Sequence, residues 1–350
     1  MMHFGADELR RDGHQVSLLF REQLALDCPF VLRRFLAPLR TLQWIRRHRG
    51  EFDVVELHEP LAAPYALARR RDRSLPALIV LSHGLEERSL TASIAYHRHK
   101  RLPFPLQRRL FPLSIVWQAQ YAVRHADHVL CCNQDDIDFL VSEGVPAARL
   151  SRNINAVSDT YLSLARPQGE DRSGWLFLGS WLTRKGTMDL VPAMTAVLRR
   201  HRQWRFTAAG TGCDVPVVTR QFPEDVRSQI DVLPHIDTDD ALAALCRSHA
   251  VCVLPSYFEG QPLVIFEAGA AEMAIVTTNI CGMKDFVHDG ESGRLVPVGD
   301  PAALERALDE AVLHAGDWGP RARAGVITGH TWRHAADRLL EAYRSASRAR

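Results

Sequence analysis

Lysine is scarce in this chain of 350 residues: Lys100, Lys185 and Lys284 are the only three, and arginine supplies the rest of the 43 basic side chains. The seven cysteines form no Cys-x-x-Cys pair, which argues against a metal site, and several lie in apolar runs, as buried thiols of a reducing compartment do. No apolar run reaches the length of a membrane span. These absences predict a cytoplasmic protein with no metal ligands and no obligatory cofactor.

Basic residues are concentrated in one region, although the net charge is only +2. Residues 31–124 hold 17 Lys+Arg against 7 Asp+Glu, which favours contact with a negative surface. Within this region, residues 30–47 and 98–117 mix apolar and basic side chains at helical spacing. Two interpretations stay open: peripheral contact with an anionic membrane on its inner face, or ordinary helices that pack an apolar side on a sheet.

Short apolar runs alternate with helical patterns along the whole chain. Strands are expected at residues 16–19, 54–57, 78–81, 128–132, 175–178, 205–208, 230–233, 251–254 and 275–278. Helices are expected at 30–48, 60–72, 106–125, 134–143, 186–201, 238–248, 262–272 and 301–314. This alternation predicts an α/β fold with parallel sheets covered by helices. A polar stretch at residues 166–173 predicts a linker between two domains.

Residues 254–267 combine the end of a strand, a turn and two carboxylates. Glu259 is expected in the loop after the strand, and Glu267 on the helix whose first turn contains Pro262. The backbone between them lies at a helix N-terminus, which favours an anion. This cradle comprises Gly260, Gln261, Pro262, Leu263 and Val264. Flanked by two acceptor side chains, it predicts a ligand with both phosphate and hydroxyl groups, such as a nucleotide sugar.

The order of the motifs resembles that of the retaining glycosyltransferases of family 4, the glycosyl transferases of group 1. The matching elements are Phe177-Leu178-Gly179, Lys185-Gly186, Gly210-Thr211-Gly212, Glu259 with Glu267-Ala268, Gly290-Glu291-Ser292-Gly293, Gly13-His14-Gln15-Val16 and Ser82-His83-Gly84. The resemblance is best over residues 174–300. It implies the GT-B fold, in which two doubly wound Rossmann-like domains face each other across a cleft. The acceptor domain would span residues 1–165 and the nucleotide-sugar domain 174–330, with a last helix at 331–350 that crosses back.

The resemblance also implies roles for individual residues. Lys185 would hold the donor diphosphate, Glu259 would contact the transferred sugar, and His83 would lie beside that sugar, so these three are the expected catalytic residues. Glu267 would accept hydrogen bonds from ribose hydroxyls, and Ile236 would contact the nucleobase. Simpler interpretations remain: a solvated lysine, a helix-capping glutamate, a surface glutamate, and a histidine bonded to loop carbonyls. Acceptor-side positions would be His58, Glu86 and Arg88, although solvated charge explains the last two equally well.

The chain departs from the family pattern at several places. Ser180 occupies the position where an arginine is usual, and Arg184 is the candidate to supply the missing charge. The first strand and its glycine-rich turn do not precede Met1-Met2-His3, which suggests a truncated start. The pair Asp136 and Asp138 is assigned to the first turns of a helix, where acids suit the dipole.

These observations predict a hexosyltransferase-type enzyme that moves a sugar from a nucleotide-diphosphate sugar to a hydroxyl acceptor and retains the anomeric configuration. The acceptor would be a glycan, a lipid-linked molecule or a small molecule, and nucleic acid is not an expected partner. Two alternatives are a nucleotide-sugar epimerase or phosphorylase of the same fold, and an inactive protein that only binds nucleotide sugars. Ser180 and the short N-terminus favour the second of these.

Overall fold

The computed structural model describes residues 2–24, 26, 30–110, 112–164 and 172–348. Contacts divide the chain into unit 1, made of Met1–Ile154 and Arg333–Arg350, and unit 2, made of Asn155–Trp332. Most of the expected linker at 166–173 lies outside the described residues. Arg172, near its end, donates hydrogen bonds to the carbonyl oxygens of Arg247 and Glu272, which fixes it to unit 2.

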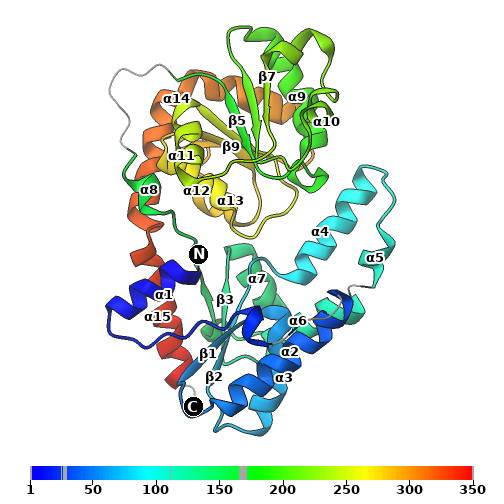
Figure 1. Cartoon of the computed structure of the whole chain (residues 1–350). Helices are drawn as coiled ribbons and strands as arrows, with labels where there is room; N and C mark the ends of the chain where they lie inside the picture. Colours follow the sequence, from blue (N-terminus) through cyan, green and yellow to red (C-terminus); the bar gives the residue numbers. More distant parts are fainter. Residues whose placement is uncertain (1, 25, 27–29, 111, 165–171, 349–350) are drawn as a thin grey trace. The chain divides into compact units, whose positions relative to one another are not determined.

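Unit 1 contains a parallel sheet of four strands in chain order, β1 (Val54–His58), β2 (Ala77–Leu81), β3 (His128–Cys131) and β4 (Leu150–Arg152) (Figure 1). Strand β2 is buried along its whole length because both faces are covered. Leu78 and Val80 pack in a core with α2 (Phe30–Arg47), α3 (Glu59–Arg71) and α6 (Trp117–His125). Ile79, on the opposite face, packs on Ala342 and Ala346 of the last helix, α15 (Trp332–Arg348).

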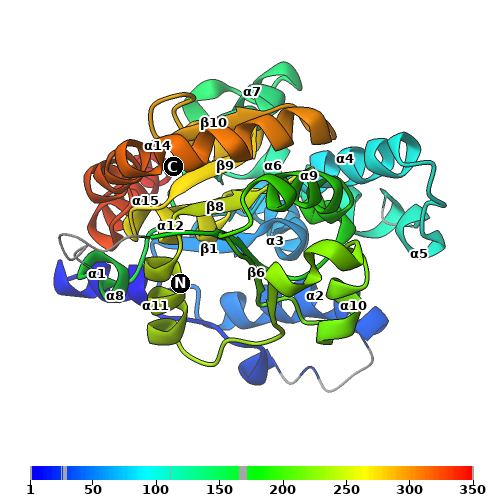
Figure 2. The same ribbon diagram turned by 90° about the horizontal axis from the view of Figure 1, so that it is seen from above.

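Unit 2 contains a six-stranded parallel sheet in the order β10-β9-β8-β5-β6-β7. Its strands are β5 (Trp175–Leu178), β6 (Phe206–Ala209), β7 (Ile230–Leu233), β8 (Val251–Leu254), β9 (Ala274–Thr278) and β10 (Gly293–Val296). The main helices around it are α9 (Thr187–Arg200), α11 (Asp239–Ser248), α12 (Leu263–Ala270) and α14 (Pro301–Gly329), of which α9 packs against α14 (Figure 2). The predicted α/β class is therefore confirmed.

The strand order of unit 2 reverses between β5 and β8. From β5 the chain adds β6 and β7 on one side, then returns to place β8, β9 and β10 on the other. At such a reversal the connections after the two central strands diverge, and a crevice opens outside their carboxyl ends where ligands of doubly wound sheets bind. The connections after β5 and β8 are therefore the first place to look for a site.

The strand expected at residues 16–19 is wrong. Residues 14–20 have no regular structure, and Val16 accepts a hydrogen bond from Arg10 of α1 (Met2–Arg11) through its carbonyl oxygen. An apolar run becomes a strand only when a neighbouring strand supplies hydrogen bonds, and no described strand pairs with this segment.

Two expected helices also differ from the structure. The helix at 106–125 is broken into α5 (Leu106–Arg109), a π-helical turn (Pro112–Val116) and α6, because Pro112 lacks an N–H and disfavours helix before it. The helix at 301–314 continues as α14 to Gly329. Strands β4 and β10, and helix α4 (Glu86–His99), were not expected. Pro262 lies one residue before α12, as its N-cap, and not in its first turn.

Candidate functional site

An ion pair lies at the reversal of the unit 2 sheet. Lys185 follows β5 and Glu259 follows β8, and the Lys185 Nζ is 2.5 Å from the Glu259 Oε1. Both side chains are 11% exposed, so the pair is largely withdrawn from water but can be reached by a ligand. Sequence separates these residues widely, and the strand order brings them together.

Gly186 explains why Lys185 reaches this position. It has a φ of 76° and lies between the 3-10 turn Thr183–Lys185 and α9. A Cβ atom at Gly186 would lie 1.9 Å from the Pro255 carbonyl oxygen, in the loop after β8. Only glycine combines this left-handed backbone with so close an approach. The two loops are thus in direct backbone contact, which holds the Lys185 side chain against Glu259.

Tyr257 fastens the same two loops, a role that the sequence did not indicate. Its N–H donates to the Arg184 carbonyl oxygen at 2.8 Å, and its hydroxyl donates to the Asp189 Oδ2, on α9, at 2.6 Å. The Ser256 hydroxyl donates to the Glu259 Oε1 at 2.9 Å, which orients the carboxylate. The signal in the sequence was only that Ser256 and Tyr257 lie between β8 and Glu259.

Arg184 and Ser180 are both exposed in the loop that follows β5. The Arg184 Nη1 lies 3.6 Å from the Glu259 Oε1, and the side chain is half exposed. Ser180 is exposed and follows Gly179, whose φ is 133°. Arg184 therefore directs a second positive charge to the Glu259 carboxylate, near the turn where Ser180 replaces the usual arginine.

The expected cradle before α12 is partly occupied by the protein itself. The Gln261 side-chain oxygen accepts a hydrogen bond from the Asn155 backbone N–H. The Gln261 backbone carbonyl oxygen accepts one from the Asn155 Nδ2 at 2.7 Å. The Gly260 carbonyl oxygen accepts from the Gly282 N–H at 3.0 Å. Gln261 thus ties the start of unit 2 to the loop, while the half-buried Leu263 and Val264 form the first turn of α12.

Glu267 lies on α12 in a different environment from Glu259. Burial raises the pKa of its carboxyl group to about 7, and the negative charge of Asp239 at the start of α11 adds to the shift. Because its ordinary value is 4.5, this group changes charge near neutral pH instead of well below it. It is therefore suited to accept or donate a hydrogen bond to a ligand hydroxyl.

A groove of about 620 Å³ follows β7 in the same unit. Its lining includes Leu233 at the end of β7, the exposed His235, the half-buried Ile236, and Ala241 and Leu245 of α11. The Gly210 N–H donates to the Leu233 carbonyl oxygen at 2.8 Å, so this groove adjoins the turn after β6. Ile236, expected at the nucleobase, therefore lines an open and largely apolar surface.

In unit 1, two expected residues meet at the carboxyl ends of β1 and β2. The rings of His58 and His83 are stacked, with centroids 4.8 Å apart. Burial, together with the charge of His83, lowers the pKa of His58 to about 4, and burial also lowers the pKa of His83. The His58 Nδ1 is buried without a hydrogen-bond partner. The pair is therefore neutral at neutral pH.

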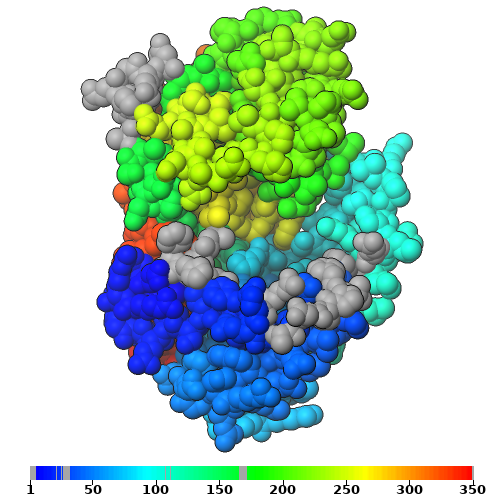
Figure 3. Space-filling view, in the orientation of Figure 1, coloured from blue at the N-terminus to red at the C-terminus, as the bar shows by residue number. Residues whose placement is uncertain are grey.

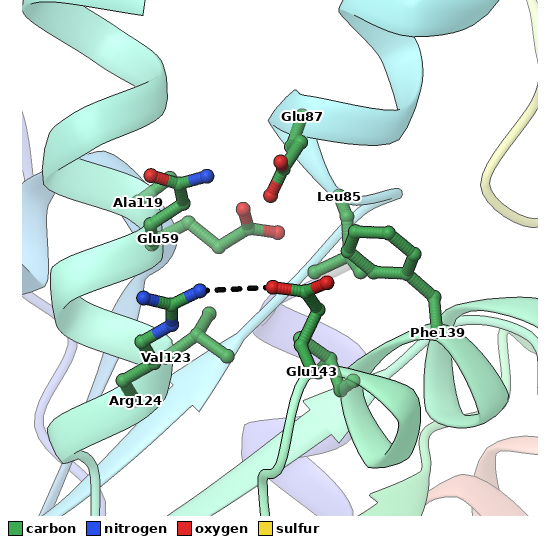
Figure 4. Close-up of a pocket in the computed structure, with 10 residues that line it drawn as sticks. Glu59, Leu85, Glu87, Ala119, Val123, Arg124, Phe139 and Glu143 are labelled. Atoms are coloured by element: carbon green, nitrogen blue, oxygen red, sulfur yellow. Dashed lines mark hydrogen bonds and ion pairs between the residues drawn. The ribbon is translucent and has the colours of Figure 1, made fainter.

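Glu59, which directly follows His58, was not singled out in the sequence. It is 4% exposed, and burial raises the pKa of its carboxyl group to about 8. Hydrogen bonds from the Ser82 side chain and the Glu86 N–H act in the opposite direction and lower this pKa. Its carboxyl group points into a cavity of about 20 Å³, toward those of Glu87 and Glu143 (Figure 4). Glu143 is paired there with Arg124 at 3.0 Å. The cavity has room for about one water molecule.

Glu86 and Arg88 begin α4 and contact different neighbours. Burial raises the pKa of Glu86, while the charges of Arg108 and Arg34 lower it. The Arg88 Nη1 is 2.5 Å from the Oδ1 of Asp136, which is fully buried. Asp136 lies in the first turn of α7 (Gln134–Ser142), as expected for the Asp136 and Asp138 pair. Arg88 thus neutralises a buried carboxylate and joins α4 to α7.

Within the described ranges, no group of three or more His, Cys, Asp or Glu side chains is arranged to hold a metal ion. The helices of those ranges include none that is both long and apolar enough to cross a membrane.

Two family models match the chain. The first, described as a glycosyl transferase 4-like domain, matches residues 6–155, and the second, described as glycosyl transferases group 1, matches residues 172–313. A glycogen synthase of Mycobacterium tuberculosis is 27% identical over 304 residues, which cover 85% of this chain and 69% of that protein. A phosphatidyl-myo-inositol mannosyltransferase of Mycobacterium leprae is 28% identical over 311 residues, which cover 85% of this chain and 75% of that protein.

Solved structures are similar in fold. A sucrose-phosphate synthase of Thermosynechococcus elongatus superposes with a TM-score of 0.66 and 19% identity, covering 91% of this chain and 79% of that one. HepE of Anabaena, solved in complex with UDP, has a TM-score of 0.64 and 15% identity, with 86% and 80% of the two chains covered. At these identities the likeness concerns the fold alone, and it agrees with the two parallel α/β sheets described above.

Proposed function

Because this chain belongs to the glycosyl transferases of group 1, enzymes of the GT-B fold that use nucleotide sugars, we propose that it transfers a sugar from a nucleotide-diphosphate sugar to a hydroxyl acceptor with retention of the anomeric configuration. The observation that carries the proposal is the ion pair of Lys185 with Glu259 at the reversal of the unit 2 sheet. In the absence of donor, each partner satisfies the other's charge in a site withdrawn from water.

A bound donor would replace this pair with two better matched contacts. The diphosphate would take Lys185, whose compact ammonium stabilises the negative charge that develops as the glycosidic bond breaks. Arg184, already within 3.6 Å of Glu259, would add a second charge in place of the arginine missing at Ser180. Glu259 would then be released to accept hydrogen bonds from the hydroxyls of the transferred sugar.

Glu267 would accept the ribose hydroxyls, and the nucleobase would lie against Ile236 in the groove after β7. Support for Glu267 comes from its half-buried place on α12 and its raised pKa. The Anabaena protein of similar fold binds UDP, which makes a uridine nucleotide the first donor to test. The backbone of Gly260, Leu263 and Val264 would complete the diphosphate cradle at the start of α12.

Retention would not require a protein nucleophile. The departing phosphate would help to deprotonate the acceptor on the same face of the sugar, and the protein would supply positioning and charge. His83 would lie beside the donor sugar, and its lowered pKa supports a neutral ring that can donate or accept one hydrogen bond. His58, stacked on His83, Glu86 and Arg88 remain the predicted acceptor side.

The acceptor we propose is borne by a lipid. A relative carries the name phosphatidyl-myo-inositol mannosyltransferase, although another is named glycogen synthase, so family membership alone leaves the acceptor open. The basic region at residues 31–124 favours the lipid.

The donor site is tested with Lys185→Ala. The donor is first chosen as the nucleotide sugar that raises the melting temperature most in a thermal-shift panel. Removing the Lys185 ammonium should then weaken binding of this donor about a hundredfold, as measured by calorimetry. Lys100→Ala, a lysine substitution in unit 1, is the matched control and should leave the affinity unchanged. Equal affinities of the two variants would refute the assignment of Lys185. If NMR of the donor shows its sugar interconverting without any acceptor, epimerase activity replaces the proposed transfer.

A further inference from the structure

Unit 1 exposes large apolar side chains along a short segment between α4 and α6. Leu106 is 74% exposed, Leu110 62%, Leu113 80% and Trp117 60%. They recur every three or four residues, whereas Val116, between the last two, is buried. Apolar side chains gathered in this way on a soluble surface mark a site of contact with a partner or a membrane.

Helix α2 exposes a second apolar stripe. Leu32, Phe35, Leu36 and Leu39 are 39–54% exposed, and their spacing places them on one face of the helix. The opposite face packs on unit 1 through the buried Thr41 and Ile45. Helix α2 therefore has one apolar face that packs on unit 1, chiefly on α3, and a second apolar face that stays exposed.

The two segments belong to one region of unit 1. The charges of Arg34 of α2 and Arg108 of α5 both lower the pKa of the Glu86 carboxyl group, so both side chains lie near the start of α4. The Arg108 Nη1 also donates to the Ser93 hydroxyl of α4 at 2.9 Å. Both ribbon views show α4 and α5 beyond the sheet on one side of unit 1 (Figures 1 and 2), and Figure 3 shows their cyan atoms at its surface.

The apolar residues are accompanied by exposed arginines. Arg40 follows the α2 stripe in sequence, Arg98 and Arg101 precede the Leu106–Trp117 segment, and Arg109 lies within it; all four are exposed. The stretches at residues 30–47 and 98–117 themselves contain no Asp or Glu. Ten of the 17 basic residues within 31–124 lie in residues 30–47 and 98–117, which favours a negatively charged partner.

We infer that the α2–α5 surface, defined as Leu32, Phe35, Leu36, Leu39, Leu106, Leu110, Leu113 and Trp117 with Arg40, Arg98, Arg101 and Arg109, docks on an anionic phospholipid bilayer. The leucines would enter the boundary between the lipid headgroups and the acyl chains. The tryptophan would lie at the headgroup level, and the arginines would pair with lipid phosphates. A second copy of the chain fits less well, because the arginines of the two copies would face each other.

This inference deepens the proposed function, since it names the surface through which the enzyme would reach a lipid-borne acceptor. It can nevertheless fail separately from sugar transfer. Membrane docking involves residues of unit 1 surface helices, whereas the donor site involves Lys185 and Glu259 of unit 2. Vesicle binding can be measured without donor, and donor binding without vesicles.

The test is co-sedimentation of the full chain with vesicles of phosphatidylcholine alone or mixed with phosphatidylglycerol. We expect binding to the mixed vesicles, weakened by salt. The double variant Leu110→Glu with Leu113→Glu should lower the partition coefficient at least about tenfold, because two buried side chains leave the bilayer and two charges are repelled. Leu313→Glu is the matched control: this leucine of α14, in unit 2, is also 80% exposed.

A second pair of variants separates charge from apolar contact. Arg109→Glu should weaken binding to the mixed vesicles about fivefold or more, while Arg306→Glu, also an exposed arginine but on α14, should not. The inference is overturned if the leucine variant and Leu313→Glu bind vesicles equally. It is also overturned if the wild type does not bind the mixed vesicles, and a dimer that Leu110→Glu with Leu113→Glu converts to monomer in light scattering would then assign the surface to a second copy of the chain. Unchanged donor affinity in all four variants would show that the donor site is intact.

Discussion

Unit 1 and unit 2 both place polar side chains after parallel strands, but the order of the strands differs. In unit 2 the order reverses between β5 and β8, and loops from both sides of the reversal meet as Lys185, Tyr257 and Glu259. In unit 1 the described strands follow chain order without reversal, and its strand ends carry the neutral pair of His58 and His83. The Lys185–Glu259 pair therefore lies where the strand order reverses and a crevice is expected, whereas the His58–His83 pair lies after strands that follow chain order.

The hydrophobic cores of the two units also differ. Unit 2 has one continuous core that joins both faces of its sheet. Unit 1 has separate cores on the two faces, and the smaller one depends on α15, which is distant in sequence. Glu56 of β1 is tied to this helix by the Tyr343 hydroxyl at 2.9 Å. In unit 2, contacts between the loops thus hold the candidate site in place. In unit 1, the comparable contacts attach helix α15 to the sheet.

The largest expected effect comes from Gly186→Ala. A methyl group 1.9 Å from the Pro255 carbonyl oxygen, on a backbone with a φ of 76°, must push the loops after β5 and β8 apart. We expect the free energy of unfolding to fall by about 3 kcal/mol or more and donor binding to be lost. Gly144→Ala in unit 1 is the control: its φ is 83°, but nothing lies within 4 Å, so the loss should be about 1 kcal/mol. Similar melting temperatures would contradict the close contact.

Two tyrosines sharpen the comparison at a smaller scale. Tyr257→Phe removes the hydrogen bond to Asp189, and Tyr343→Phe removes the one to Glu56. Each should lower the free energy of unfolding by about 1–2 kcal/mol, because a buried carboxyl group loses a donor. Only Tyr257→Phe should also weaken donor binding, about fivefold to tenfold, through the shifted Glu259 loop. Equal donor affinity of the two variants in calorimetry would show that Tyr257 does not position the site.

The last expected effect is a pH dependence. Glu267 has a pKa raised from 4.5 to about 7, so its contribution to stability is full below about pH 4.5 and is lost as pH rises through about 7. Donor affinity should run the opposite way, because the ionised carboxylate accepts ribose hydrogen bonds more strongly. It should rise up to about tenfold from about pH 6 to about pH 8. Glu267→Gln should flatten both profiles; a rise that survives in this variant must come from another group.

The sequence was most reliable where local pattern and burial agree. The strands expected at 175–178 and 251–254 are confirmed residue for residue, because each is a continuous apolar run buried along its whole length. The strand expected at 230–233 is confirmed as well, although it lies at the edge of the sheet and Asp231 interrupts its apolar run. The run at 16–19 has a similar pattern but forms no strand. What it lacks is a hydrogen-bonding neighbour, and a local pattern carries no information about neighbours.

The candidate site shows the same limit to what a local sequence pattern can predict. The residue types and their order predict Lys185, Glu259 and Glu267 as donor-site residues, but the contact between the first two depends on which strands adjoin at the reversal. Gln261 was predicted to bind donor, and its side chain is bonded to Asn155, about a hundred residues away in the chain. The raised pKa of Glu59 results from burial, which cannot be predicted from the residue type alone.

By itself, therefore, the sequence determined the α/β class, most strands and helices, the family and the residues that predict a donor site, because these depend on local periodicity and on motif order. The tertiary structure decided that Gly186 and Pro255 touch, that Lys185 pairs with Glu259, that Glu267 and Glu59 have raised pKa values, and that four apolar side chains between Leu106 and Trp117 remain exposed. Each of these depends on which distant segments exclude water from a given atom, and that is fixed only when the strands are paired and the helices are packed.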